Sequence, residues 1–313
     1  MTQGGERVLV TGATGFLGEA VVRALATQGR SVRAAVRHDP GNWHPGVEVV
    51  RVGELGPDTD WSLALRDVEV IVHCAARAHV LRETADDPLA AFRRANTEGA
   101  AALARQAKAA GVQRLVFISS IGVNGSETTG KPFTAHDAPR PQSPYAVSKY
   151  EAELALAEIA ADGMMELVVI RPPLVTGPDA KGNLGTLARW IDRGIPLPLG
   201  LVTGNRRDLV SRETLVDLIG VCLDHPAARG QTFLISDGRP VSTRQLLVDM
   251  AARQGRRAKL WPMPPLLLDL GLRALGRTAM RSQLLGDLEL DIAHTRRTLN
   301  WHPTSLPHTG AMG

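Results

Sequence analysis

The feature that most constrains this chain is a glycine-rich segment that directly follows an apolar strand near the N-terminus. Residues 7–10 have the composition of a strand, and Thr11-Gly12-Ala13-Thr14-Gly15-Phe16-Leu17-Gly18 leads from it into an alanine-rich helix predicted over 16–28. Gly12 permits a tight turn, Gly15 lets the backbone approach a pyrophosphate, and Gly18 allows close packing of helix on strand. The first N–H groups of such a helix attract phosphate. The predicted contacts to a dinucleotide are Gly12, Thr14, Gly15, Phe16, Leu17 and Gly18.

The first half of the chain alternates apolar strands with helical stretches, which is typical of a parallel sheet covered on both faces. Strands are predicted over 7–10, 31–36, 47–52, 68–73, 112–119, 166–171 and 231–236, and helices over 16–28, 88–110, 146–160 and 214–223. We therefore expect an α/β fold, a Rossmann-like doubly wound parallel sheet with a smaller C-terminal substrate-binding lobe. The expected dinucleotide-binding domain is 1–172, with 205–238 returning to it, and the lobe comprises 173–204 and 239–313.

The end of the second predicted strand bears on the choice of dinucleotide. Enzymes that use NAD place an acid there to accept hydrogen bonds from the adenine ribose. This chain has Val36 at that position, followed by Arg37, whose guanidinium suits a 2′-phosphate. Arg37 can also be read as a solvated loop residue. The sequence favours NADP(H), with NAD(H) as the alternative.

Composition excludes several classes of protein. The 313 residues are 44% hydrophobic and 22% charged, which is ordinary for a globular protein, and a net charge of +4 is too small to indicate nucleic-acid binding. Cys74 and Cys222 are the two cysteines, so no disulfide framework is expected. The polar N-terminus has no signal-peptide pattern, and the apolar stretch 264–272 is too short to span a bilayer. We expect a cytoplasmic protein in which 264–272 is a core helix or a surface that touches a membrane.

Tyr145 and Lys149 form the candidate catalytic pair. Four residues apart on a helix, they share one face. Tyrosine has an ordinary pKa of about 10, and a nearby ammonium favours the tyrosinate, so Lys149 is expected to bring the pKa of Tyr145 toward the working range. Ser120, after the apolar strand 115–118, could hydrogen-bond the same substrate oxygen. The trio predicts a proton donor or acceptor for a carbonyl or alcohol beside a nicotinamide.

The glycine loop, Ser119-Ser120, Tyr145-x-x-x-Lys149 and Arg171-Pro172-Pro173 together resemble the extended short-chain dehydrogenase/reductase family, and more narrowly its nucleotide-sugar epimerases, dehydratases and reductases. The resemblance runs to Trp301-His302-Pro303. It implies that Ser120, Tyr145 and Lys149 are catalytic, with Lys149 also on the nicotinamide ribose. The further cofactor-site residues that it implies are Cys74, Ala75, Ala76, Asn96, Ser119 and Pro172. Asn96 could equally be only a structural link between helix and strand.

The resemblance also implies a diphosphate site in the C-terminal lobe. Asn183 and Arg207 match positions that hold the diphosphate of a nucleotide sugar, and Arg281 is a further candidate whose local spacing departs from the epimerase pattern. His79 is a candidate substrate contact. The alternative for Arg207 is that it forms a solvated pair with Arg206. No metal is implied.

The nearest resemblance within the family is to bacterial UDP-4-keto-N-acetyl-sugar reductases and UDP-sugar 4-epimerases of surface-polysaccharide synthesis. It implies NADPH-dependent reduction of the C4 ketone of a UDP-linked 4-keto sugar that is 6-deoxy and N-acetylated. The first alternative is an NAD-dependent UDP-glucose or UDP-N-acetylglucosamine 4-epimerase that uses the same residues. A reductase of hydrophobic ketones and a non-catalytic NADP sensor also stay open. A homodimer through helices 88–110 and 146–160 is expected from the resemblance.

Overall fold

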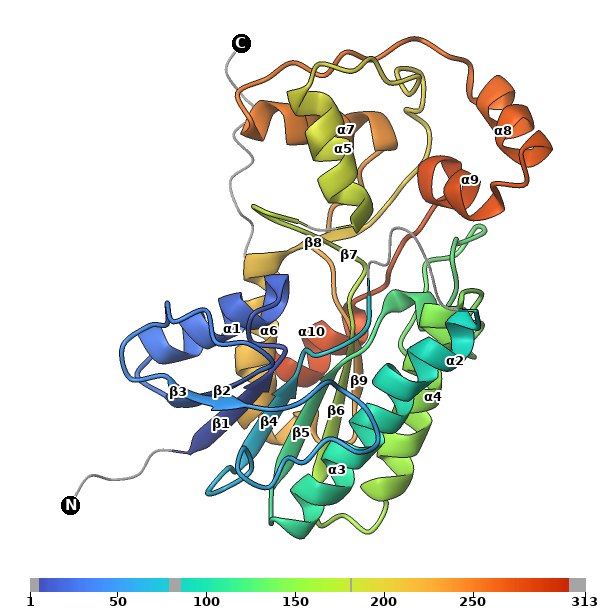
Figure 1. Cartoon of the computed structure of the whole chain (residues 1–313). Coiled ribbons are helices and arrows are strands. Elements are labelled where there is room, and N and C mark those ends of the chain that lie inside the picture. Colours follow the sequence, from blue (N-terminus) through green and yellow to red (C-terminus); the bar gives the residue numbers. More distant parts are fainter. Residues whose placement is uncertain (1–5, 79–85, 181, 304–313) are drawn as a thin grey trace.

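A seven-stranded parallel sheet forms the centre of the molecule (Figure 1). The computed structural model describes residues 6–78, 86–180 and 182–303. The strand order is β3-β2-β1-β4-β5-β6-β9, and every pairing is parallel. The strands are β1 (Arg7–Thr11), β2 (Ser31–Val36), β3 (Glu48–Arg51), β4 (Val70–His73), β5 (Arg114–Ile118), β6 (Glu166–Arg171) and β9 (Thr232–Leu234). The predicted Rossmann-like fold class is confirmed, and the predicted strand 231–236 does return to the sheet beside β6.

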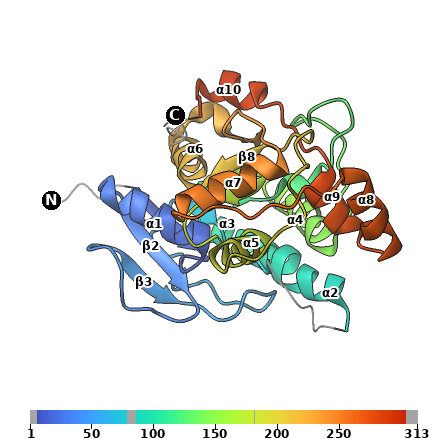
Figure 2. The same cartoon turned by 90° about the horizontal axis from the view of Figure 1, so that it is seen from above.

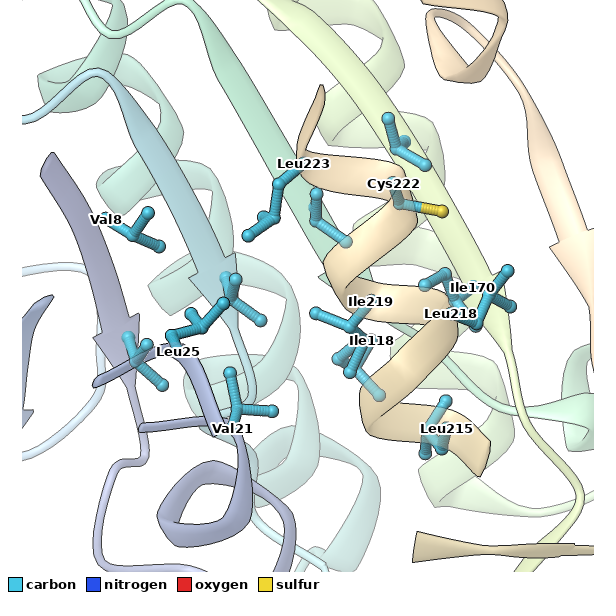
Figure 3. Close-up of a cluster of buried hydrophobic side chains, with 14 of the residues drawn as sticks. Val8, Val21, Leu25, Ile118, Ile170, Leu215, Leu218, Ile219, Cys222 and Leu223 are labelled. Carbon is cyan, nitrogen blue, oxygen red and sulfur yellow. The ribbon is translucent and has the colours of Figure 1, made fainter. Parts of the chain in front are cut away.

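Helices cover both faces of the sheet because its strands are apolar on both sides. Helices α1 (Phe16–Thr27) and α6 (Arg212–Asp224) share one core with Val8 and Val10 of β1, whereas α3 (Gly99–Ala109) and α4 (Pro144–Ile159) share the other with Leu9. Figure 3 shows α6 directing Leu215, Leu218, Ile219 and Cys222 toward the sheet. Each fully buried aliphatic side chain of this kind stabilises the fold by about 1.5–3 kcal/mol.

The predicted helix 88–110 is one continuous rod in three parts. It begins as α2 (Pro88–Phe92), where the Asp87 side chain accepts a hydrogen bond from Ala90 N, passes through a π-helical turn, η1 (Arg93–Glu98), and continues as α3. A π-turn inserts one extra residue per turn and often marks a functional site. Sequence periodicity did not reveal it because the turn has no compositional signature.

The C-terminal part of the chain stands above the carboxyl ends of the strands (Figure 1). It contains a two-stranded parallel sheet, β7 (Leu174–Thr176) with β8 (Leu209–Ser211), where the sequence predicted only loops and short helices. A separate apolar cluster, which includes Ile191, Leu199 and Leu247, forms its core. Its helices are α5 (Gly182–Asp192), α7 (Thr243–Arg253), α8 (Pro265–Ala274) and α9 (Thr278–Leu285).

The last helix, α10 (Ala293–Leu299), packs instead on β9 of the large sheet.

The predicted boundaries between the dinucleotide-binding domain and the C-terminal lobe stay a prediction. Within the described ranges, no helix is long and apolar enough to cross a membrane.

Candidate active site

A cavity of about 2600 Å³ runs along the carboxyl ends of the strands and into the C-terminal lobe. It lies where the strand order reverses, between β1 and β4, which is the usual ligand site of a doubly wound sheet. The structure brings nearly all the predicted site residues to it, namely Gly12, Thr14, Gly15, Phe16, Leu17, Gly18, Arg37, Cys74, Ala75, Ala76, Ser119, Ser120, Tyr145, Lys149, Pro172, Asn183, Arg207 and Arg281. Asn96 does not line the cavity, and His79 lies outside the described residues.

Gly12 and Gly18 of the glycine loop lie where a side chain would not fit. Gly12 has a φ of +65°, and a Cβ there would lie 2.7 Å from Ala75 N. A Cβ on Gly18 would lie 2.2 Å from Gly12 O, so the helix packs directly on the loop. Helix α1 begins at Phe16, and its N-cap residue, Gly15, has no side chain to cap it. Its free N–H groups at the cavity wall fit the diphosphate of a dinucleotide.

The wall beside β2 includes residues that sequence reasoning missed. Val36 is buried at the strand end and Arg37 is exposed at the cavity edge, as predicted. Gly53, Glu54 and Leu55, which follow β3, also line this part of the cavity. The sequence could have indicated this segment, because it directly follows the predicted strand 47–52, which pairs with β2.

Ser143 and Pro144 fix the start of the helix that carries Tyr145 and Lys149. The Ser143 side chain accepts a hydrogen bond from Ala146 N at 3.2 Å, and proline occupies the first turn. The helix therefore begins earlier than the predicted Ala146. Tyr145 lies in its first turn and Lys149 one turn further, so the predicted sharing of a face is confirmed.

Lys149 is buried yet borders the cavity. Its Nζ lies 4.1 Å from the centroid of the Phe117 ring and forms no hydrogen bond or ion pair within the described part of the chain. Burial lowers the pKa of Lys149 to about 7, although the nearby charges of Glu153 and Cys74 act in the opposite direction. A buried amine at a cavity wall that has no hydrogen-bond acceptor among the described residues suits a ligand hydroxyl such as that of a ribose.

Tyr145 differs from expectation in the direction of its pKa shift. Burial raises the pKa of Tyr145 to about 12 rather than lowering it. The phenol packs edge-on against Phe92 with ring centroids 6.0 Å apart, and its environment disfavours the charged form. Desolvation alone accounts for the direction of this shift, and the amine of Lys149 one turn along the helix does not offset it.

Ser120 is fixed at the end of β5. Its backbone is extended, and its Oγ accepts a hydrogen bond from Gly122 N at 3.1 Å at the start of the 3₁₀ turn η2 (Ile121–Val123). The hydroxyl proton stays available for an oxygen in the cavity. Ser120 and Tyr145 are thus both presented to the same cavity.

A buried polar network that the sequence analysis missed lies behind this pair. Glu153, one turn beyond Lys149, accepts hydrogen bonds from Ser119 Oγ and from Arg171 Nε, the latter at 2.9 Å. Arg171 Nη1 donates to Asn124 Oδ1 at 3.0 Å. The network joins the ends of β5 and β6 to α4. The sequence could have indicated Glu153, because it lies four residues after Lys149 on the predicted helix and so shares its face.

Asn96 supports the site without bordering it. From the π-turn η1, its side chain accepts from Arg77 N at 2.8 Å and donates to Arg77 O at 3.1 Å and to Ser148 Oγ at 3.0 Å. These bonds tie η1 to Arg77 and to α4, which fits the structural-link interpretation, and the cofactor contact of Asn96 stays a prediction.

The arginines of the C-terminal lobe differ in their availability. Arg207 is buried and held by backbone bonds to Val241, and its Nη1 donates to the carbonyls of Ser282 and Gly286 at 3.0 and 2.8 Å. Burial lowers the pKa of Arg207. It has no salt bridge to the described residues, so its charge suits an anionic ligand. The solvated-pair alternative for Arg207 is wrong, because it is buried.

Arg281 and Asn183 are already engaged by protein groups. Arg281 Nε lies 2.5 Å from Asp269 Oδ1, and its Nη1 lies 3.4 Å from Glu127 Oε2. Asn183 donates to Gln283 at 2.8 Å. The charge of Arg281 is therefore already balanced by carboxylates, which makes Arg281 a weaker candidate for a diphosphate contact than Arg207.

The fold and cavity define an enzyme of the extended short-chain dehydrogenase/reductase type. Residues 8–236 match the NAD dependent epimerase/dehydratase family, and the chain belongs to that family. It is 43% identical over 298 residues to a UDP-glucose 4-epimerase of Vibrio cholerae, covering 95% of this chain and 90% of that protein. A UDP-glucose 4-epimerase of Mycolicibacterium smegmatis is 32% identical, covering 89% of this chain and 92% of the relative. The solved structure of MoeE5 in complex with UDP-glucose and NAD is 25% identical, with a TM-score of 0.74 and coverage of 97% of this chain and 95% of that one.

Proposed function

We propose that this enzyme is a UDP-sugar 4-epimerase. The observation that carries the proposal is the 43% identity to a UDP-glucose 4-epimerase over 95% of the chain. The presence of Ser120, Tyr145 and Lys149 at one cavity wall supports it. The reductase interpretation, which the sequence analysis preferred, has weaker support than this alternative.

The cavity suits a nicotinamide dinucleotide. In the proposal, the α1 N-terminus and the glycine loop hold its diphosphate, Lys149 binds its nicotinamide ribose, and Arg37 lies beside its adenosine end. The group, when bound, supplies reversible hydride transfer at the sugar C4.

The side chains handle the proton and position the sugar. Tyr145 takes the proton of the C4 hydroxyl as the ketone forms and returns it after the sugar has turned its other face, while Ser120 Oγ orients that oxygen. Lys149 favours the tyrosinate when it is protonated. Arg207, with Asn183, holds the diphosphate of the substrate and so positions the ring.

A UDP-4-keto-sugar reductase is the second candidate, and Arg37 is the observation that favours it. The strand end has valine where an acid would accept the ribose hydroxyls, and Arg37 at the cavity edge suits the 2′-phosphate of NADPH. A cofactor consumed in each turnover must exchange, whereas an epimerase regenerates it in place.

One experiment separates the two functions. Purified protein is incubated with UDP-glucose or UDP-N-acetylglucosamine and NAD, the nucleotide sugars are separated by chromatography, and absorbance at 340 nm is followed. The epimerase gives gluco–galacto interconversion with no net absorbance change. A parallel reaction contains NADPH and a UDP-4-keto-6-deoxy sugar. Stoichiometric NADPH loss there, without interconversion in the first reaction, overturns the epimerase and establishes the reductase.

The proposal includes a cytoplasmic homodimer. Leu154 on α4, which is 53% exposed, lies on the helix pair expected to form the interface. Light scattering after gel filtration tests it, and a monomer would contradict it.

A further inference from the structure

Helix α8 presents its apolar side to solvent. Among its ten residues are five leucines, and none of the ten is buried. Leu266, Leu267 and Leu270 are 68%, 56% and 55% exposed. At about 100° per residue these three leucines span one side of the helix, whereas Leu268 and Asp269 face the protein. A surface helix of an ordinary globular protein has the reverse arrangement.

The exposed apolar surface extends beyond α8. Trp261 lies three residues before Pro264, the N-cap residue of α8, and is 62% exposed. Leu275, the C-cap residue of α8, is 70% exposed. The segment from α7 to α8 runs along the edge of the lobe farthest from the large sheet (Figure 1). Figure 2 shows α8 at the periphery, with α9 on its inner side. We refer to Trp261, Leu266, Leu267, Leu270 and Leu275 as the apolar edge.

The chain around the apolar edge is strongly basic. Residues 253–281 contain seven basic residues and one acidic residue, although the whole chain has a net charge of only +4. The one acid, Asp269, pairs inward with Arg273 and Arg281. Four of the basic residues form no ion pair within the described ranges. Arg253 is one of them but lines the cavity, which leaves Arg257, Lys259 and Arg277 in the segments that flank the apolar edge.

We propose that the apolar edge docks this enzyme onto an anionic membrane surface. An exposed leucine face with tryptophan and flanking arginines is the composition of a helix that lies in the interfacial plane of a bilayer. The unpaired cations are complementary to anionic headgroups, which attract basic segments near the surface. A second copy of the chain is a poorer occupant, because a symmetric contact would bring these cations against their own counterparts.

The docking has a consequence for the cavity. Arg273, Thr278 and Arg281, from α8 and α9, line it. Docking of the apolar edge therefore places this end of the cavity beside the membrane.

Flotation of the full chain with vesicles tests the proposal. One set of vesicles contains phosphatidylethanolamine and phosphatidylglycerol in equal parts, and the other contains phosphatidylcholine only. We expect binding to the anionic vesicles, weakened by salt. Leu266→Ser/Leu270→Ser should weaken that binding about tenfold or more, because both leucines lose their burial in the interface. Leu63→Ser is the matched control, since Leu63 is 57% exposed on the loop before β4, and it should bind as the parent does.

Two further readouts distinguish the other occupants. The melting temperature of Leu266→Ser/Leu270→Ser should equal that of the parent, since the replaced side chains are exposed, and sedimentation should give an unchanged oligomeric state. The proposal is overturned if anionic vesicles do not bind the parent, or if they bind both proteins equally. It is also overturned if the double variant dissociates an oligomer, which would assign the apolar edge to a second copy.

Discussion

Arg171 donates two hydrogen bonds to the carboxylate of Glu153, at 2.9 Å to Oε1 and 2.5 Å to Oε2, and both side chains are buried. Glu153 lies one turn beyond Lys149 on α4, and Arg171 ends β6. The pair therefore fixes the helix that carries Tyr145 and Lys149 to the strand ends that line the cavity. The negative charge of Glu153 also raises the pKa of Lys149, against the larger effect of burial, which lowers it.

Glu153→Gln should destabilise the protein by about 3–5 kcal/mol, because it leaves the Arg171 charge buried without its counter-ion. Chemical denaturation measures the change. Glu151→Gln is the control. Glu151 lies on the same helix as Glu153 and pairs at the surface with Arg93 of η1, so the loss of this ion pair should cost at most about 1 kcal/mol. Equal losses in the free energy of unfolding for the two variants would show that the buried pair contributes no more to stability than the surface pair.

Tyr145→Phe should lower turnover by about 10²–10⁴-fold and leave dinucleotide affinity nearly unchanged, because it removes the proposed acid/base group and little else. Steady-state kinetics and calorimetric titration give the two quantities. The chain has one other tyrosine, so Tyr150→Phe is the control and should keep parental turnover. Retention of more than about a tenth of parental turnover in Tyr145→Phe would remove Tyr145 from the acid/base role.

Lys149→Met should stabilise the ligand-free protein at neutral pH. The folded-state pKa of Lys149, about 7, lies below its ordinary value, so the unfolded chain binds the proton more tightly. The resulting destabilisation is fully present below pH 7 and is relieved as the pH rises from about 7 toward 10. The variant should therefore exceed the parent by on the order of a few kcal/mol at pH 6, with a smaller difference at pH 9.

Thermal unfolding at the two pH values measures this difference, with Lys131→Met as the control at an exposed lysine. A difference between variant and parent that does not change with pH would contradict the lowered pKa. The same variant should lose dinucleotide affinity, because it lacks the amine proposed to bind the ribose.

Gly18→Ala should abolish dinucleotide binding and destabilise the fold, since the added Cβ would lie 2.2 Å from Gly12 O. Gly220→Ala is the matched control inside α6, where a Cβ meets nothing within 4 Å. That change should stabilise the protein by about 0.4–1 kcal/mol, because it removes backbone freedom from the unfolded chain. Calorimetric titration and denaturation check both variants, and normal binding by Gly18→Ala would refute the packing role of Gly18.

The sequence was sufficient to predict the parallel sheet and the part of the cavity wall formed by the glycine loop, Ser120, Tyr145 and Lys149. Strands that are buried on both faces appear in the sequence as continuous apolar runs. The glycine loop predicts a tight strand-to-helix turn, and the four-residue spacing of Tyr145 and Lys149 predicts that they share a helix face; both patterns are local in the sequence. Local pattern did not identify Glu153, because its partner Arg171 is distant in the chain and an i,i+4 acid is also common on solvated helices. The raised pKa of Tyr145 and the pairing of β7 with β8 likewise depend on tertiary surroundings.

Arg37→Ala tests the interpretation of the β2 strand end. If the guanidinium binds a 2′-phosphate, its loss should weaken NADPH binding by about 1.5–3 kcal/mol, or one to two decades in Kd, and leave NADH binding almost unchanged. Calorimetric titration with both cofactors gives the comparison, and Arg66→Ala, at an exposed arginine before β4, serves as the control. Equal losses for NADPH and NADH would exclude the phosphate contact. The strand end would then provide no reason to prefer the reductase, because Val36 alone neither binds a phosphate nor accepts a ribose hydroxyl.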